Sequence, residues 1–278
     1  MRILLPPSEG KTAPADGPAL HLRGLSYPEL TAARERVLEA LIAVSKRDNA
    51  NEILGVGRRV MPEVVSQRDI LFAPCAPARE VYTGVLYEAA QLCRGDDVRI
   101  FSGLFGVTTG EDLIPTYRLS MNVSLPGIGN LKTFWRRELA QAGVEGSDCR
   151  QQHCEMRHSG AQSPAGASQT GDIELYRDAA EANMAQTTID MRSGAYQVTA
   201  PYGDWWDLRV VDSRGKVITH AAKHYRGLLT RALLDAGHER QPGLGKATLT
   251  DVAQVAGTLG HVEVTHDGLR HHITLMLE

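Results

Sequence analysis

A short apolar run at the start of the chain is followed at once by two prolines. Arg2–Leu5 is largely aliphatic, and Pro6 and Pro7 come directly after it. Because proline has no N–H to donate to a neighbouring strand, the pair ends a strand rather than extending it. Ser8–Pro18, which follows, is rich in glycine and proline. The sequence therefore predicts a buried first strand that opens into a loop.

Helical and strand-like patterns alternate along the rest of the chain. Helical spacing of apolar residues predicts helices over 27–45, 85–92, 131–142, 173–185, 222–236 and 249–259. Strand-like runs lie between them at 98–104, 187–191, 206–211 and 216–220, and a terminal hairpin is predicted over 261–277. The predicted fold class is therefore α/β (mixed α+β), with a mixed sheet flanked by helices in a single compact domain over 1–278.

Composition limits the classes of function. The chain has 278 residues, of which 42% are hydrophobic, enough for a substantial core. The net charge of −3 is not typical of a nucleic-acid-binding domain, although a local basic cleft is compatible with it. Neither a signal peptide nor a membrane-spanning stretch is recognisable. We expect a cytoplasmic, monomeric protein without a membrane partner.

A polar segment at about 144–171 differs in composition from the rest. It is rich in Ser, Gly, Gln, Cys and His and has no apolar period, which predicts a flexible insertion. Cys149, His153, Cys154 and His158 all fall within ten residues of it. Structural zinc sites usually have ordered structure between better-separated ligand pairs. We therefore predict no metal site and no cofactor.

Four motifs occur in a fixed order along the first half of the chain. They are PPSEGK at 6–11, VYTG at 81–84, SGLFGV at 102–107 and DLIPTYRLSM at 112–121. An aromatic pair at 134–135, the segment 190–196 and a basic helix with Lys223 and Arg226 follow them. In this order the motifs resemble the YaaA (UPF0246) family over about positions 3 to 235.

The resemblance implies both a fold and a cellular role. It implies a mixed α/β fold with a basic cleft, and a cytoplasmic role in limiting intracellular iron and the DNA damage that follows peroxide exposure. Some members of the family are described as DNA-binding, with an element like a helix-hairpin-helix. The chain departs from the family pattern in its longer insertion and in the segment beyond His238.

Several basic residues are candidates for holding an anion. Lys11 follows a strand and a glycine, where a lysine can reach a phosphate or carboxylate, although the spacing of a P-loop is absent. Arg118, beside Tyr117, fits either bidentate phosphate recognition or an ion pair with Asp112. Together with the resemblance, this gives the predicted ligand- or DNA-binding residues Ser8, Lys11, Tyr117, Arg118, Lys132, Arg192, Lys223 and Arg226.

A glycine-rich turn precedes one of these residues. Ser124–Gly129, followed by Lys132, resembles the hairpin of a helix-hairpin-helix, in which turn amides and a lysine hold a DNA phosphate. The second helix is predicted from about Leu131. The sequence does not support the first helix of the motif, because 117–123 has no helical period. The alternative is a tight glycine turn that leads into a helix.

The sequence does not identify a catalytic residue. Asp112, Asp190 and Tyr82 are candidates for acid–base chemistry if a cleft brings them near the basic residues. One hypothesis is a YaaA-like stress protein that binds DNA through a basic cleft. The other is an enzyme that acts on a small anionic or nucleotide-like substrate held by the same residues. A third hypothesis is a scaffold protein that binds a partner through the insertion.

Overall fold

The first strand lies inside a seven-stranded mixed sheet. The computed structural model describes residues 1–144, 187–201, 203–239 and 249–277. Within them the strand order is β10-β11-β9-β8-β1-β3-β4. The strands from β11 to β3 in this order are parallel, and β10 and β4 are antiparallel edge strands. The predicted mixed sheet is confirmed.

The elements have the following bounds. The strands of the large sheet are β1 (Arg2–Leu5), β3 (Val98–Ser102), β4 (Gly106–Thr109), β8 (Thr188–Asp190), β9 (Trp205–Val211), β10 (His261–Asp267) and β11 (Arg270–Met276). Two small sheets pair β2 (Ala76–Pro77) with β5 (Leu113–Ile114) and β6 (Ser124–Leu125) with β7 (Gly129–Asn130). The α-helices are α1 (Thr31–Ser45), α2 (Ala50–Leu54), α3 (Met61–Ser66), α4 (Ala78–Val81), α5 (Val85–Ala90), α6 (Leu131–Gln141), α9 (Thr219–Glu239) and α10 (Leu249–Gly257). Short 3-10 helices lie at Leu22–Gly24, Pro28–Leu30, Arg58–Val60 and Gln67–Phe72.

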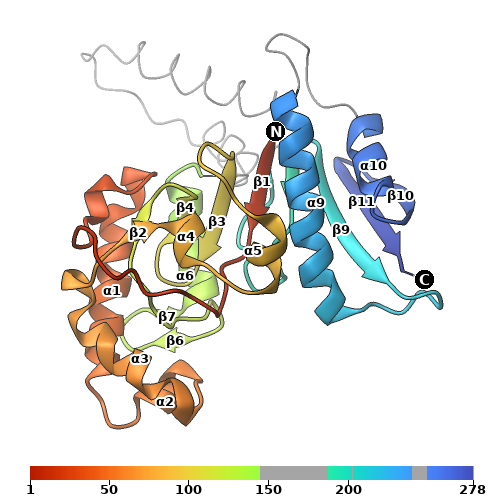
Figure 1. The fold of residues 1–278 in the computed structure, drawn as a ribbon. Coiled ribbons are helices and arrows are strands. Elements are labelled where there is room, and N and C mark those ends of the chain that lie inside the picture. Colours follow the sequence, from red (N-terminus) through yellow and green to blue (C-terminus); the bar gives the residue numbers. More distant parts are fainter. Residues whose placement is uncertain (145–186, 202, 240–248, 278) are drawn as a thin grey trace, which may run out of the picture.

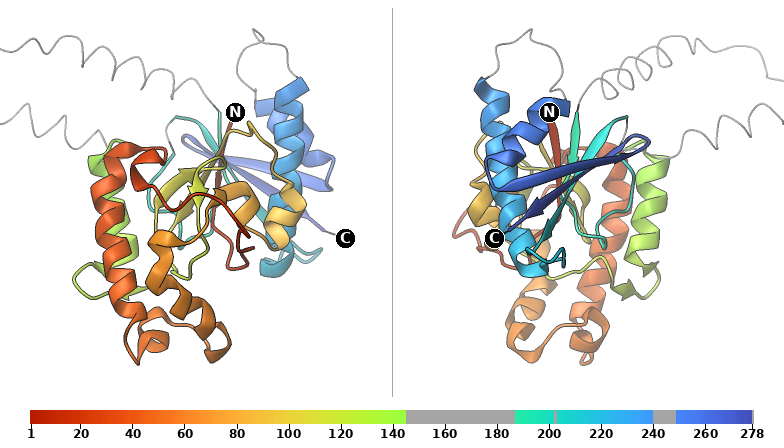
Figure 2. Two further views of the ribbon diagram at one scale, coloured as in Figure 1. Left: turned by 60° about the vertical axis from the view of Figure 1, so that its left-hand side comes forward. Right: turned by 90° about the vertical axis from the view of Figure 1, so that its right-hand side faces the viewer.

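Helices cover both faces of the large sheet (Figure 1). Figure 2 shows α1 and α6 on one face and α5 and α9 on the other. Because β1 is covered from both sides, Ile3, Leu4 and Leu5 have no exposed surface. A strand with one face in water would instead alternate apolar and polar residues. None of the helices in the described ranges is long and apolar enough to cross a membrane.

Most predicted elements are present, but one strand is not. Instead of a strand at 216–220, the chain makes only an isolated bridge between Val211 and Val217, and α9 begins at Thr219. The carboxylate of Asp212 accepts hydrogen bonds from two backbone amides, and this closes a tight turn directly before the helix. The predicted helix at 173–185, and the predicted insertion beyond Val144, lie outside the described residues.

The topology opens a crevice beside β1. The chain crosses from β1 to β3 on one side, and it later returns to β8 on the other side before it continues to β9. Loops that leave the carboxyl ends of two neighbouring parallel strands in opposite directions leave a crevice between them. The segments that follow Leu5 and Asp190 are therefore the expected borders of a binding site.

A glycine in α9 permits close packing against α5. A Cβ atom built on Gly227 would lie 2.2 Å from the carbonyl oxygen of Leu86, whereas Gly237 in the same helix has nothing within 4 Å. We expect Gly227→Ala to lower the free energy of unfolding by about 1–3 kcal/mol, because backbone must move to accept the methyl group. The matched change Gly237→Ala is expected to raise it by up to about 1 kcal/mol. Urea denaturation of both variants checks this, and equal effects would contradict the packing argument.

Candidate functional site

The loop after β1 is held by backbone pairing with the segment before α5. Lys11 and Tyr82 form an isolated antiparallel bridge. Beside it, the Thr12 N–H donates to the Val81 carbonyl at 2.9 Å, and the Thr83 N–H donates to the Gly10 carbonyl at 3.0 Å. Gly84 ends this segment with φ at +97°, and a Cβ atom there would lie 3.0 Å from Oγ of Ser8. Two motifs that lie about 70 residues apart in the sequence, PPSEGK and VYTG, therefore form one structural unit.

Two buried tyrosines lie against the side chain of Lys11. The hydroxyls of Tyr82 and Tyr117 are hydrogen-bonded to each other at 2.6 Å. Lys11 Nζ lies 4.5 Å from the ring centroid of Tyr117 and 5.5 Å from that of Tyr82. Burial raises the pKa of both phenols well above the ordinary value. The tyrosines therefore stay protonated near neutral pH and present ring faces, which attract a cation.

A cavity of about 350 Å³ opens above this lysine. Four of the predicted binding residues line it: Ser8, Lys11, Tyr117 and Arg118. The remaining walls come from the loop after β1, the end of α2 and the segment between α2 and α3, the chain after Arg118, and the loop after β8. Their residues are Pro7, Glu9, Leu54, Gly55, Val56, Gly57, Val60, Leu119, Ser120 and Tyr196. The cavity thus lies at the crevice that the strand order predicts.

The guanidinium of Arg118 is held by a carboxylate at the cavity edge. Its Nε and Nη2 both donate to Glu63, with an Nη2–Oε1 distance of 3.1 Å, and its backbone N–H donates to the side chain of Gln67. The predicted alternative of an ion pair between Arg118 and Asp112 is wrong, because Arg118 pairs with Glu63. The Asp112 carboxylate instead accepts hydrogen bonds from Ser26 and from the backbone of Thr109.

The amine of Lys11 is shifted toward its neutral form. Its Nζ donates to the backbone carbonyl of Ser8 at 2.7 Å. Burial lowers the pKa of Lys11 to about 7, and the positive charge of Arg118 acts in the same direction, while Glu63 and Glu9 oppose the shift. At pH 7, a substantial fraction of the molecules therefore carry Lys11 as a neutral amine. Lysines with this property serve as bases or nucleophiles in enzymes.

Two of the other predicted residues secure the loop after β8. Arg192 and Asp190 form a fully buried ion pair through two hydrogen bonds of 2.9 Å, and the guanidinium lies 4.2 Å from the ring centroid of Phe101. Lys132 Nζ donates to the carbonyl of Gly194 at 2.7 Å. Neither basic side chain lines the cavity. Both hold the segment that carries Tyr196 to its wall.

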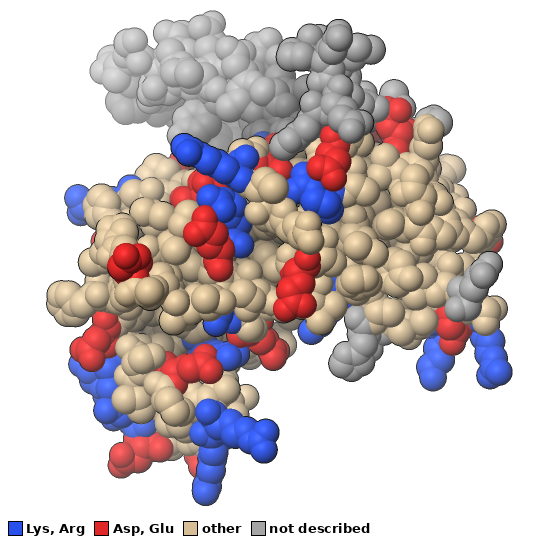
Figure 3. All heavy atoms as spheres, viewed as in Figure 1, with Lys and Arg blue, Asp and Glu red and all other residues tan. Residues whose placement is uncertain are grey.

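The basic residues of α9 are not part of the lining of the Lys11 cavity. Lys223 is exposed, and Arg226 is partly buried. Burial lowers the pKa of Arg226, and Asp190 and Asp207 oppose that shift. Neither residue lines the cavity. Figure 3 shows one face of the molecule, on which Lys and Arg side chains are interspersed with Asp and Glu.

The glycine-rich turn before α6 is a short β-hairpin. Strands β6 and β7 pair across it, and Gly127 and Gly129 adopt φ of +80° and +83°. Residues 117–123 contain no helix. Asn130 then caps α6 by accepting a hydrogen bond from the Thr133 amide. The arrangement fits the tight glycine turn and lacks the first helix of a helix-hairpin-helix.

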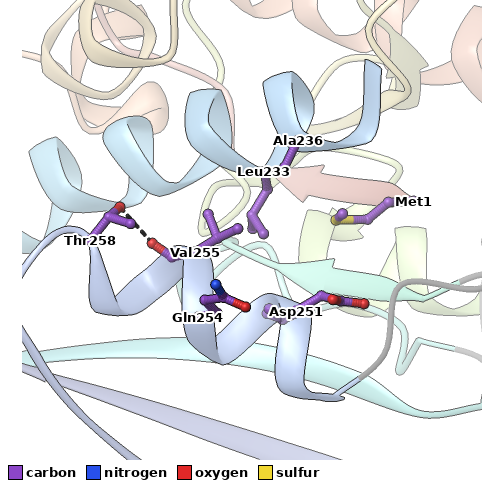
Figure 4. A pocket seen from close by; sticks show the side chains of 8 residues that line it. Met1, Leu233, Ala236, Asp251, Gln254, Val255 and Thr258 are labelled. Carbon is purple, nitrogen blue, oxygen red and sulfur yellow. Dashed lines mark hydrogen bonds between the residues drawn. The ribbon is translucent and has the colours of Figure 1, made fainter. Parts of the chain in front are cut away.

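Metal ligands do not cluster in the described ranges, which contain no group of three or more His, Cys, Asp or Glu side chains able to hold an ion. Cys149, His153, Cys154 and His158 lie outside those ranges. A second cavity of about 200 Å³ lies between α9 and α10 (Figure 4). Its walls are mainly aliphatic, with Leu233 and Val255 among them. Lysine and arginine are absent from its lining, so it does not offer an anion site.

Sequence reasoning missed three kinds of contributor to the site. Glu63 and Gln67, which hold Arg118, lie in a helical stretch without a recognisable motif. Tyr196 lines the cavity, and the only signal for it was its place in the segment after a predicted strand. Gly55 and Gly57 also line the cavity, and the signal that marks Gly55 is that of a glycine ending a short helix, where it adopts φ of +64°.

Comparison with known proteins establishes the family. The family model described as "Peroxide stress protein YaaA" matches residues 1–152. A UPF0246 protein of Streptomyces coelicolor is 43% identical over 254 residues, covering 85% of this chain and 84% of that protein. A UPF0246 protein of Corynebacterium efficiens is 32% identical over 295 residues, covering 100% of both chains. The chain belongs to the YaaA family.

The motifs of this YaaA-family chain meet around the cavity. A Cβ atom on Gly103 would lie 2.7 Å from the carbonyl oxygen of Leu119, and one on Gly106 would lie 2.6 Å from the Trp135 ring. Trp135 Nε1 donates to the carbonyl of Gly103 at 2.8 Å. Glycine is thus required where the SGLFGV turn packs against the DLIPTYRLSM segment and α6. These contacts position Tyr117 and Arg118.

The shifted lysine predicts a specific dependence of stability on pH. Burial holds the pKa of Lys11 in the folded chain at about 7, below the ordinary lysine pKa of 10.5. The unfolded chain therefore binds more protons between these values, and stability rises with pH across this window. We expect this lysine alone to add about 2 kcal/mol between pH 7 and pH 9. Comparing urea denaturation of the natural chain and Lys11→Met at both pH values isolates the effect. Parallel pH profiles would contradict it.

Proposed function

We propose that this YaaA-family chain is a cytoplasmic, monomeric protein of the peroxide response and that it acts on a small anionic compound bound in the Lys11 cavity. The observation that carries the proposal is that Lys11 and Arg118 share one cavity, whereas Lys223 and Arg226 lie outside it. A volume of about 350 Å³ is in the range of small-molecule sites.

The chemistry of the cavity supports an enzyme rather than a simple anion trap. Arg118 offers a permanent positive charge and planar donors for a carboxylate or phosphate. Lys11, with its pKa near 7, can exchange a proton near neutral pH. Tyr82 and Tyr117 form a buried hydroxyl pair behind it. Asp112 and Asp190 are engaged in structural hydrogen bonds, so the lysine is the preferred acid–base group.

DNA binding through a basic cleft is the competing hypothesis, and it makes different demands. It requires Lys223 and Arg226 to act together with Lys11 and Arg118 over an extended surface. The negative net charge and the mixed charges of Figure 3 give it less support than the shared cavity gives the small-molecule hypothesis.

Anion binding distinguishes the two hypotheses. We expect a small carboxylate or phosphate at about ten times its Kd to raise the melting temperature by roughly 3 °C, because it binds only the folded chain. Arg118→Gln and Lys11→Met should abolish this shift, and the matched surface change Lys223→Gln should leave it intact. The cleft hypothesis predicts instead that all three changes weaken binding of a labelled DNA duplex. That result, together with no shift for any anion tested, would exclude the proposed function.

A further inference from the structure

We infer that Lys11 forms a covalent imine with an aldehyde or ketone whose carboxylate or phosphate is bound by Arg118. The inference rests on the proposed function and specifies its substrate class as small carbonyl compounds that carry an anionic group.

The amine is held at a fixed point of the cavity. The backbone bridge to Tyr82 fixes the Lys11 main chain, and Nζ donates to the Ser8 carbonyl at 2.7 Å. Ring faces of Tyr82 and Tyr117 lie behind it. A nucleophile restrained in this way attacks a bound carbonyl with a smaller loss of entropy than a mobile surface lysine.

The surroundings suit both forms of nitrogen that the reaction requires. Attack requires a neutral amine, which burial and the charge of Arg118 favour, while Glu9 and Glu63 act against it. The imine is cationic when protonated. The tyrosine faces attract that cation as they attract the ammonium, and its remaining N–H can still donate to the Ser8 carbonyl. The same contacts therefore serve before and after the covalent step.

The two cations then have separate roles. Arg118 stays charged and keeps donors at the cavity edge, where a carboxylate or phosphate of the substrate can replace or share Glu63. Lys11 adds to the carbonyl carbon, and its proton passes to the carbonyl oxygen. The carbinolamine then loses water as the C–O bond breaks and the C=N bond forms. No oxidant, reductant or metal enters this step.

Reductive trapping tests the inference directly. The full-length protein is incubated at pH 7 with glyoxylate and cyanoborohydride, which reduces an imine to a stable secondary amine, and peptide mass mapping locates the carboxymethyl group. We expect Lys11 to be modified at least about tenfold faster than Lys46 or Lys223. The rate should rise as pH passes through 7. Modification spread evenly over the lysines would overturn the inference.

A second aldehyde separates the nucleophile from the anion site. Formaldehyde carries no anionic group, so Arg118→Gln should slow trapping of glyoxylate more than trapping of formaldehyde. Both rates are expected to fall somewhat, because removal of the arginine raises the pKa of Lys11. Equal loss for the two aldehydes would show that Arg118 does not bind the substrate anion and would overturn this part of the inference.

Lys11→Arg keeps the positive charge without a nucleophilic amine, and it is the control for the covalent step. It should abolish trapping at position 11 while the folded state is retained, as judged by circular dichroism. If small anions stabilise the natural protein but no imine forms at Lys11, the covalent inference fails and the proposed function stands. If anions neither bind nor are trapped, both fail.

Discussion

The backbone bridge between Lys11 and Tyr82 is the constraint on which the site depends. The prolines after β1 prevent the sheet from continuing, so the chain needs another partner, and it finds one in the segment before α5. That pairing brings the lysine side chain onto the ring faces of Tyr82 and Tyr117. Without it, the loop after β1 would be an ordinary glycine-rich connection, and its lysine would lie in solvent.

Burying a lysine in this way is unfavourable for folding. A cation removed from water needs a close carboxylate to offset the loss of hydration. Here the carboxylates that oppose the shift, Glu9 and Glu63, do not restore the ordinary pKa, and Glu63 is already paired with Arg118. Ring faces and one carbonyl compensate only in part. The lowered pKa of Lys11 therefore costs the folded chain stability at neutral pH, a trade-off that is common at active sites.

Local patterns in the sequence predict most helices and strands. The features that these patterns do not predict depend on contacts between side chains and on residues far apart in the sequence. The helix at 222–236 and the terminal hairpin follow from apolar spacing and from an Asp-Gly turn, and both are present. The strand at 216–220 was wrong because the hydrogen bonds of the Asp212 side chain decide the local conformation. Glu63 as the partner of Arg118 lies 55 residues away, and no spacing rule connects the two. The motifs indicated where the cavity lies because each contributes a glycine or an aromatic residue to one packed unit. The order of the motifs along the chain does not by itself say how they are arranged in space.

Lysine and arginine are not interchangeable in this cavity, and the difference bears on what it can do. A pocket that only retained an anion would gain most from two permanent charges, and a second arginine would supply that better than a lysine whose pKa is lowered to about 7. The chain instead places the one basic group that can lose its proton over aromatic rings, and the one that cannot beside a carboxylate at the edge. For anion binding alone, this arrangement gives less positive charge than two arginines would give. It is what a site requires when one cation must hold the substrate and the other must react with it.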